Sequence, residues 1–403
     1  METVVIIGAG ASGMMAALSA LEAGDKKVIL LERQQRPGRK LLATGNGRCN
    51  LTNTGAKPEN YHGAQEDFPA PVLKRFGPKE TLDFFHSLGL LTVEEYGGRV
   101  YPLSDHANSV ADVLRFALQQ RGAELRCSCP ALSLERRDKG YAVVTEAGAV
   151  MADYVIVACG GAAGAKLGGV MDGYKLLKPL GHKAGPLYPA LVQILSDSPY
   201  PRSLKGVRAD GRAELFKNGE LLASSQGEIQ FTDTGISGPA AFDLSRCVAQ
   251  GGEGLELRLD LLKDYELSYV LCLLEARRRD LPQIQSGEIF TGMLHNRLGR
   301  MIVKYAGLPG ELPLSQLSGQ QLKACACAAK DFRLNVTGTL GFDQAQVTAG
   351  GIKTGGFDPN TLESWFMPRL FVCGELLDVD GDCGGYNLQW AWSSGYVAGR
   401  LGK

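Results

Sequence analysis

Three glycines near the start of the chain, Gly8, Gly10 and Gly13, have the spacing that lets a backbone approach a phosphate group closely. Residues 3–7 form an apolar run typical of a buried strand, and residues 14–23 have helix-forming composition. In this context Gly8 permits a tight turn, Gly10 allows close approach to a pyrophosphate, and Gly13 allows the helix to pack on the strand. The unpaired N–H groups of the first helical turn would face the phosphates.

An acidic residue, Glu32, follows a second short apolar strand at residues 28–31. A carboxylate at this place accepts hydrogen bonds from an adenosine ribose and repels a 2′-phosphate. Gly8, Gly10 and Gly13 are the only glycines with this spacing, so we expect one tightly bound dinucleotide. The alternative is a glycine turn that binds nothing.

A second candidate motif lies at the other end of the chain. Residues 370–375 form an apolar strand that stops at Gly374-Glu375, and residues 381–387 lead into a predicted closing helix at 388–400. A pocket completed by both ends of the chain favours FAD, which is a long cofactor. Because Gly384 and Gly385 precede the helix, its first amides would face the N1 and C2 carbonyl edge of the flavin and stabilise the charge of its reduced form.

Two further segments carry residues suited to a nucleotide site. Residues 44–48 combine two glycines with Arg48, whose planar guanidinium can clamp a pyrophosphate or a substrate carboxylate. Residues 153–159 form a predicted strand that ends at Gly160 and Gly161, as in a crossover beneath a cofactor. The alternatives are a surface turn and an ordinary core strand.

The ten cysteines indicate reduced thiols. Cys127/Cys129 and Cys325/Cys327 have a single intervening residue, which is shorter than zinc-binding pairs usually have, and histidine is scarce, so we expect no metal site. Cys49 and Cys383 lie inside glycine-rich motifs and would lie near a flavin. Packing is the preferred role for both thiols, and a dithiol relay is not expected.

The composition limits the possible partners. The 403 residues suffice for two or three domains, and Lys+Arg and Asp+Glu number 43 each, which argues against nucleic-acid and membrane binding. The first residues lack the features of a signal peptide, and no apolar run is long enough to span a bilayer, so a cytoplasmic location is expected. A monomer is plausible, although the sequence does not define the oligomeric state.

The pattern of elements predicts an α/β fold whose nucleotide domain is interrupted by a substrate domain. The predicted parts are the first FAD-binding segment at 1–187, a β part at 188–262, a helical part at 263–332 and the second FAD-binding segment at 333–403. The predicted elements include helices at 78–88, 108–121, 264–279 and 286–305, strands within 124–136 and at 141–146, and a hairpin around Asn218-Gly219.

The motifs at residues 38–53, 231–239, 348–352, 361–364 and 384–391 resemble the YhiN/BaiN flavoprotein family, which includes aminoacetone oxidase-like enzymes. The resemblance covers essentially the whole chain. It implies a Rossmann-type FAD-binding domain built from both termini, with an inserted β-barrel-like and helical substrate region. Family members often have His at the position of Asp233, which puts any role for an imidazole there in doubt.

Together, the motifs and the resemblance predict an FAD-dependent oxidoreductase that transfers hydride between a small organic substrate and flavin N5. Amine oxidation and ene reduction with NAD(P)H as a transient donor both remain open, and an FAD-binding RNA-modifying protein or a non-catalytic flavin-binding partner is the alternative. Tyr188, Asp233, Tyr101 and His106 are candidate acids or bases, and none is assigned. The predicted cofactor-binding residues are Gly8, Gly10, Ala11, Ser12, Gly13, Glu32, Arg33, Lys40, Gly45, Asn46, Arg48, Cys49, Asn50, Gly160, Gly161, Gly374, Glu375, Gly384, Gly385, Asn387 and Leu388.

Overall fold

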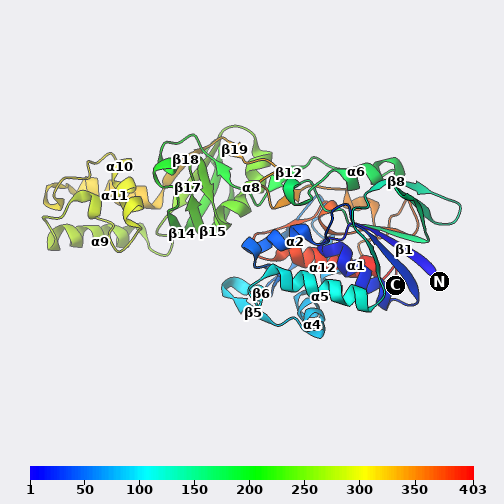
Figure 1. The fold of residues 1–403 in the computed structure, drawn as a ribbon. Helices are drawn as coiled ribbons and strands as arrows, with labels where there is room; N and C mark the ends of the chain where they lie inside the picture. The colour runs from blue at the N-terminus through cyan, green and yellow to red at the C-terminus, as the bar shows by residue number, and fades with distance from the viewer. The chain divides into compact units, whose positions relative to one another are not determined.

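The chain forms two compact units in a computed structural model that describes residues 1–403 (Figure 1). The first unit contains residues 1–188 and 342–403, and the second contains residues 189–341. Each unit has its own apolar core. The first unit is therefore built from both termini, as predicted.

A five-stranded parallel sheet forms the centre of the first unit, with the order β21-β11-β1-β2-β7. Its strands are rich in Val, Ile and Leu because a parallel sheet is covered on both faces. β1 and β2 run in register from Glu2 opposite Lys26 to Ile7 opposite Leu31. The strands are β1 (Glu2–Ile7), β2 (Lys26–Leu31), β7 (Glu124–Arg126), β11 (Tyr154–Val157) and β21 (Leu370–Val372).

The first and last long helices of the first unit lie side by side (Figure 1). α1 (Ala11–Glu22) and α12 (Tyr386–Gly399) approach each other so closely that only glycine fits at two positions of α12. A Cβ atom at Gly395 would overlap the Ser12 carbonyl oxygen, and one at Gly399 would overlap the Ala16 carbonyl oxygen. The other helices of this unit are α2 (Arg39–Ala43), α3 (Pro69–Arg75), α4 (Pro78–Ser87), α5 (Ala107–Gln120) and α6 (Asp172–Leu177).

Small antiparallel sheets complete the first unit. The predicted strand region at 124–136 divides into β7 and β8, because Ser128 adopts a φ of 50° and Pro130 follows shortly after it. The antiparallel groups are β3 (Thr52–Asn53), β6 (Arg99–Pro102) and β5 (Thr92–Glu95); β8 (Ala131–Arg136), β9 (Tyr141–Thr145) and β10 (Gly148–Ala152); and β4 (Tyr61–His62) with β22 (Asp380–Gly381). β20 (Val347–Ala349) also belongs to the first unit.

The second unit contains a seven-stranded antiparallel sheet with the order β18-β17-β14-β15-β16-β13-β19. The predicted hairpin is confirmed, since β14 and β15 pair around Asn218 and Gly219, whose φ angles are 51° and 88°. The strands are β13 (Ile194–Leu195), β14 (Arg208–Lys217), β15 (Glu220–Phe231), β16 (Gly235–Ser237), β17 (Leu255–Asp260), β18 (Phe332–Val336) and β19 (Gly338–Thr339). β18 and β19 belong to this sheet, so the chain returns to the first unit at Phe342, later than the predicted residue 333.

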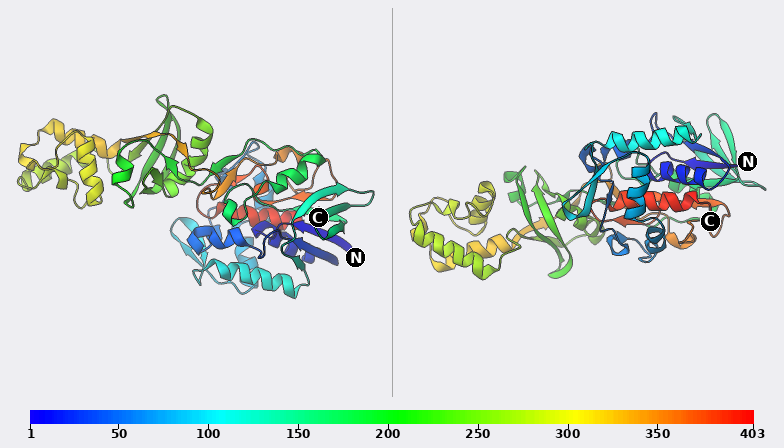
Figure 2. Two further views of the ribbon diagram at one scale, coloured as in Figure 1. Left: turned by 45° about the horizontal axis from the view of Figure 1, so that its top comes forward. Right: turned by 90° about the horizontal axis from the view of Figure 1, so that it is seen from below.

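Three helices gather at one end of the second unit's strands (Figure 2). They are α9 (Leu267–Asp280), α10 (Asn296–Tyr305) and α11 (Gly319–Lys330), and the other two helices of this unit are α7 (Tyr200–Ser203) and α8 (Pro239–Gly251). The helix predicted at 286–305 was too long, because Gly292 has a φ of 83° and α10 begins only at Asn296. None of the helices combines the length and the apolar character that a membrane span requires.

Candidate functional site

The glycine loop after β1 has the geometry that its sequence predicts. Gly8 has a φ of 104° and its N–H donates to the Leu31 carbonyl oxygen at 2.8 Å. A Cβ at Gly8 would lie 2.5 Å from the Ala158 oxygen, and one at Gly13 would overlap the Gly8 oxygen. Both positions therefore require glycine for the turn and for the packing of α1 on the sheet.

Open space lies in front of the same loop. A Cβ at Gly10 would meet no atom within 4 Å, although the glycines on either side of it are tightly packed. α1 starts at Ala11, so the N–H groups of its first residues, including Ser12, have no acceptor within the helix. Unpaired N–H groups at a helix N-terminus, with open space in front of them, can bind a pyrophosphate.

Glu32 joins this loop to the end of β2. It is 8% exposed, and its carboxylate accepts hydrogen bonds from the N–H groups of Ala9 at 2.9 Å and Gln34 at 2.8 Å. Each carboxylate oxygen can accept a second hydrogen bond, so Glu32 can still bind a ribose. Its neighbour Arg33 forms an exposed ion pair with Asp172 at 3.1 Å.

The segment after α2 turns through several left-handed residues. Gly45, Asn46 and Cys49 have φ angles of 56°, 57° and 62°. This conformation brings the backbone back on itself, and a Cβ at Gly45 would lie 2.9 Å from the Asn50 nitrogen.

Arg48 is held by acidic neighbours. Its guanidinium contacts Glu95 at 2.6 Å and also Asp105, and it lies 4.1 Å from the centre of the Tyr101 ring. Its hydrogen bonds to Glu95 and Asp105 raise the pKa of Arg48 above its usual value. The charge is thus largely neutralised within the protein, and a clamp on a ligand stays a prediction.

The two ends of the chain meet behind the glycine loop. A Cβ at Gly374 would lie 2.5 Å from the Ser12 hydroxyl, and Lys40 forms an ion pair with Glu375 at 2.7 Å. The same Glu375 accepts the N–H of Thr348 at 2.9 Å, and Gly161 packs against both side chains. Gly160, in contrast, has open space at its Cβ position.

The loop before α12 contacts the segment at residues 50–53. A Cβ at Gly385 would lie 2.5 Å from the Thr52 oxygen and 2.8 Å from Asn50 Oδ1. Asn53 Nδ2 donates to the Gly384 carbonyl at 3.0 Å, and Trp392 Nε1 donates to the Leu51 carbonyl at 2.8 Å. The predicted motifs from opposite ends of the chain therefore form one continuous region.

Two of the predicted residues shape this loop from within. Asn387 accepts the N–H of Gly381 at 2.9 Å and donates to the Gly381 carbonyl at 2.7 Å. Leu388 packs against the core of the first unit. Trp390 and Trp392 are 1% and 0% exposed, so both pack within the core of the first unit.

One buried polar atom in this region has no partner within the protein. Asn50 Oδ1 is inaccessible to solvent and accepts no hydrogen bond. Such an atom is costly to bury unless a ligand supplies the missing donor. Together with the space at Gly10 and Gly160, this acceptor fits a cofactor that extends from the first glycine loop toward residues 384–385.

The buried thiols of this region are unreactive. Burial raises the pKa of Cys49 and of Cys373 to about 12, so both remain protonated at neutral pH. Substitution of Cys49 by Ala is therefore expected to leave reduction of the cofactor largely intact.

The candidate acids lie in different settings. His106 caps α5, and its Nδ1 accepts the Asn108 N–H at 3.3 Å. Asp233 belongs to the second unit and forms an exposed ion pair with Lys205 at 2.6 Å. Tyr101 is 8% exposed, and its ring would lie 3.5 Å from a Cβ at Gly45.

Sequence reasoning missed Arg99, which lies on β6 opposite Asn53. Its Nε would lie 3.4 Å from a Cβ at Gly384. Only the alternation of residues 99 and 101 along a strand could have suggested that Arg99 shares a face with Tyr101.

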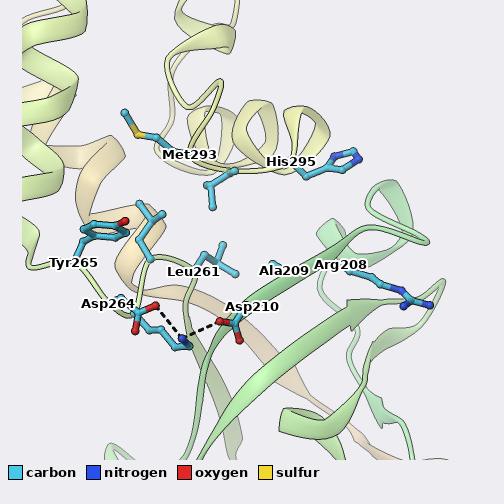
Figure 3. Close-up of a pocket in the computed structure, with 11 residues that line it drawn as sticks. Arg208, Ala209, Asp210, Leu261, Asp264, Tyr265, Met293 and His295 are labelled. Carbon is cyan, nitrogen blue, oxygen red and sulfur yellow. Dashed lines mark hydrogen bonds and ion pairs between the residues drawn. The ribbon is translucent and has the colours of Figure 1, made fainter. Parts of the chain in front are cut away.

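The second unit has a pocket of its own, of about 330 Å³ (Figure 3). Leu261, Leu262, Met293 and Leu294 supply apolar surface, while Lys263 lies between Asp210 at 2.8 Å and Asp264 at 3.0 Å. None of the predicted cofactor residues lines it, and the charge of Lys263 is already paired.

The model of the HI0933-like protein Rossmann domain matches residues 2–401. The chain belongs to the HI0933-like family. This membership confirms the resemblance inferred from the motifs, because the family model spans almost the whole chain.

Curated relatives of this HI0933-like protein are enzymes. The chain is 40% identical to a 3-dehydro-bile acid delta(4,6)-reductase of Clostridium scindens, over 99% of this chain and 98% of the relative. It is 29% identical to a ribosomal RNA dihydrouridine synthase of Escherichia coli, over 98% of this chain and 96% of the relative.

A solved structure shares the fold of the HI0933-like protein. The 3-ketosteroid delta1-dehydrogenase of Sterolibacterium denitrificans superposes with a TM-score of 0.53 at 13% identity, covering 99% of both chains. With the glycine loop and the relatives above, the chain is an FAD-dependent oxidoreductase.

Proposed function

We propose that this protein reduces a polarised carbon–carbon double bond of a small unsaturated carbonyl compound, with NAD(P)H as the electron donor. The observation that carries the proposal is the 40% identity with a 3-dehydro-bile acid delta(4,6)-reductase over 99% of the chain. The name of that relative describes reduction, and amine oxidation has no comparable support. We also propose a cytoplasmic location and no nucleic-acid partner.

The residues of the first unit would divide the work as follows. Gly10 and the first turn of α1 would hold the pyrophosphate, and Gly384 and Gly385 would adjoin the ring. Bound FAD would supply hydride transfer at N5. Reduction of a conjugated double bond also requires a proton, because hydride addition leaves negative charge on the carbonyl side of the substrate.

Tyr101 is the proposed proton donor. Burial raises its pKa above 10.0, although the nearby cations Arg99 and Arg48 oppose this shift. The hydroxyl therefore keeps its proton at neutral pH and can donate it. We expect Tyr101→Phe to slow transfer to the unsaturated substrate by about 100-fold or more while leaving reduction of the protein by NAD(P)H near the wild-type rate. Equal slowing of both steps would remove Tyr101 from this role.

A second candidate function is reduction of uridine in ribosomal RNA, which the 29% identity with a ribosomal RNA dihydrouridine synthase favours. Dihydrouridine also differs from its parent by saturation of one carbon–carbon bond. The charge of the second unit supports a small molecule instead, because residues 189–341 contain equal numbers of acidic and basic residues. RNA binding generally requires an excess of positive charge.

Reoxidation of the reduced protein by each candidate substrate in turn separates these two functions. The protein is reduced anaerobically with NADPH or NADH, and a 3-oxo-4,6-diene bile acid or a uridine-containing ribosomal RNA fragment is then added. The proposal expects rapid recovery of the oxidised flavin absorbance with the bile acid and no recovery with RNA. Recovery with RNA alone would favour the second function.

A further inference from the structure

Arg99 has a charged side chain with no direct acidic contact beside the loop that precedes α12. Its side chain is partly buried and forms no hydrogen bond or ion pair within the protein. The acid opposite it in the β5–β6 register is Glu95, but the Glu95 carboxylate binds Arg48 at 2.6 Å. The two arginines of this surface therefore differ, since Arg48 contacts two carboxylates and Arg99 contacts none.

Two acceptors in the loop before α12 are already bonded to other groups. The Gly384 carbonyl accepts from Asn53 Nδ2 at 3.0 Å, and the Asp382 carboxylate binds His62 at 2.7 Å and Asn60 at 3.0 Å. A partly buried guanidinium without a protein acceptor leaves its N–H donors to water or to a ligand. The charge of Arg99 is thus available to an anion at Gly384.

An unpaired acceptor lies on the other side of the same loop. Asn50 Oδ1 would be 2.8 Å from a Cβ at Gly385, while Arg99 Nε would be 3.4 Å from a Cβ at Gly384. A carboxylate offers only acceptors, so Asn50 Oδ1 would repel it. The pyrimidine ring of a flavin has an N–H donor between two carbonyl acceptors, and it matches a cation next to an unpaired acceptor.

We propose that Arg99 faces the pyrimidine ring of the bound FAD and favours its reduced form. Uptake of two electrons and one proton leaves one negative charge on the ring, and a nearby cation stabilises that charge. The inference rests on FAD binding and on the position of residues 384–385. It does not depend on which substrate the enzyme reduces.

The flavin midpoint potential tests this role without a substrate. It is measured by stepwise chemical reduction of the holoprotein in the presence of a reference dye, for wild type, Arg99→Met and Arg99→Lys. We expect a more negative potential in Arg99→Met and recovery of most of the shift in Arg99→Lys. Arg115→Met is the matched control, because Arg115 is exposed on α5 and pairs with Asp112 at 3.2 Å.

The outcomes are distinct. A wild-type potential in Arg99→Met, in protein that retains one FAD per chain, would overturn the proposal. If that variant instead binds the unsaturated substrate more weakly at unchanged potential, Arg99 is a substrate residue and the proposal is wrong. If Arg99→Met fails to fold, Arg99→Gln is measured in its place, with the same expected direction.

Discussion

At the scale of single residues, Glu32 has a predicted role in cofactor binding and a structural role that only the structure reveals. It stands where the sequence predicts the ribose ligand, and it also accepts hydrogen bonds from the N–H groups of Ala9 and Gln34. We expect Glu32→Ala to lower the unfolding free energy of the FAD-free protein by about 2 kcal/mol and to weaken FAD binding further. Urea unfolding and FAD titration measure the two effects separately. An FAD-free protein of unchanged stability would show that these hydrogen bonds contribute little.

His182 makes the stability of the first unit depend on pH. It is 3% exposed, its Nε2 contacts the Ser364 hydroxyl at 3.0 Å, its Nδ1 has no partner, and burial lowers its pKa below 6.5. Below that pH the unfolded chain takes up a proton that the folded protein does not. The free energy of unfolding therefore decreases as the pH is lowered. We expect His182→Gln to flatten the dependence of unfolding free energy on pH between about 7 and 5.

The control for this measurement is His86→Gln, since His86 is exposed and contacts only the Thr92 hydroxyl. It should retain the wild-type slope. Identical slopes in wild type and His182→Gln would show that other groups govern the acid sensitivity.

At the scale of elements, the close packing of α1 and α12 unites the two ends of the chain. A Cβ at Gly399 would overlap the Ala16 carbonyl and lie 2.6 Å from the Ser19 Cβ. We expect Gly399→Ala to destabilise the protein by about 2 kcal/mol and to reduce bound FAD, because α12 must move away from α1.

Gly319→Ala provides the matched comparison for this helix contact. Gly319 begins α11, and a Cβ there would meet no atom within 4 Å. Alanine should therefore be tolerated or slightly stabilising. Equal losses in both variants would mean that the α1–α12 contact is not the cause.

Local signals predicted some of these elements well and others poorly. β1, the turn at Gly8 and α1 could be predicted because an apolar run, a glycine spacing and a helix-forming run follow one another directly. α11 lies within the predicted helical part at 263–332, although no individual helix was predicted there. The pairing of β3 with β6, which brings Arg99 to Gly384, joins short strands far apart in the chain and leaves no local pattern.

At the scale of the whole molecule, an insertion divides one cofactor domain into two sequence segments. The motifs of both segments could be predicted, because glycines and acids at cofactor sites are fixed by backbone geometry. Their contacts could not, since Lys40–Glu375 and Asn50–Gly385 depend on how the two segments pack. Arg48 shows the same limit, because the sequence does not reveal that Glu95 and Asp105 neutralise it.

A single-turnover reduction tests the central claim most directly. The holoprotein is reduced with one equivalent of NAD(P)H without oxygen, mixed with one equivalent of a 3-oxo-4,6-diene bile acid, and analysed by flavin absorbance and product mass. The account predicts full recovery of oxidised FAD and a product that has gained two hydrogen atoms per FAD. Recovery that requires oxygen, with the bile acid unchanged, would contradict it.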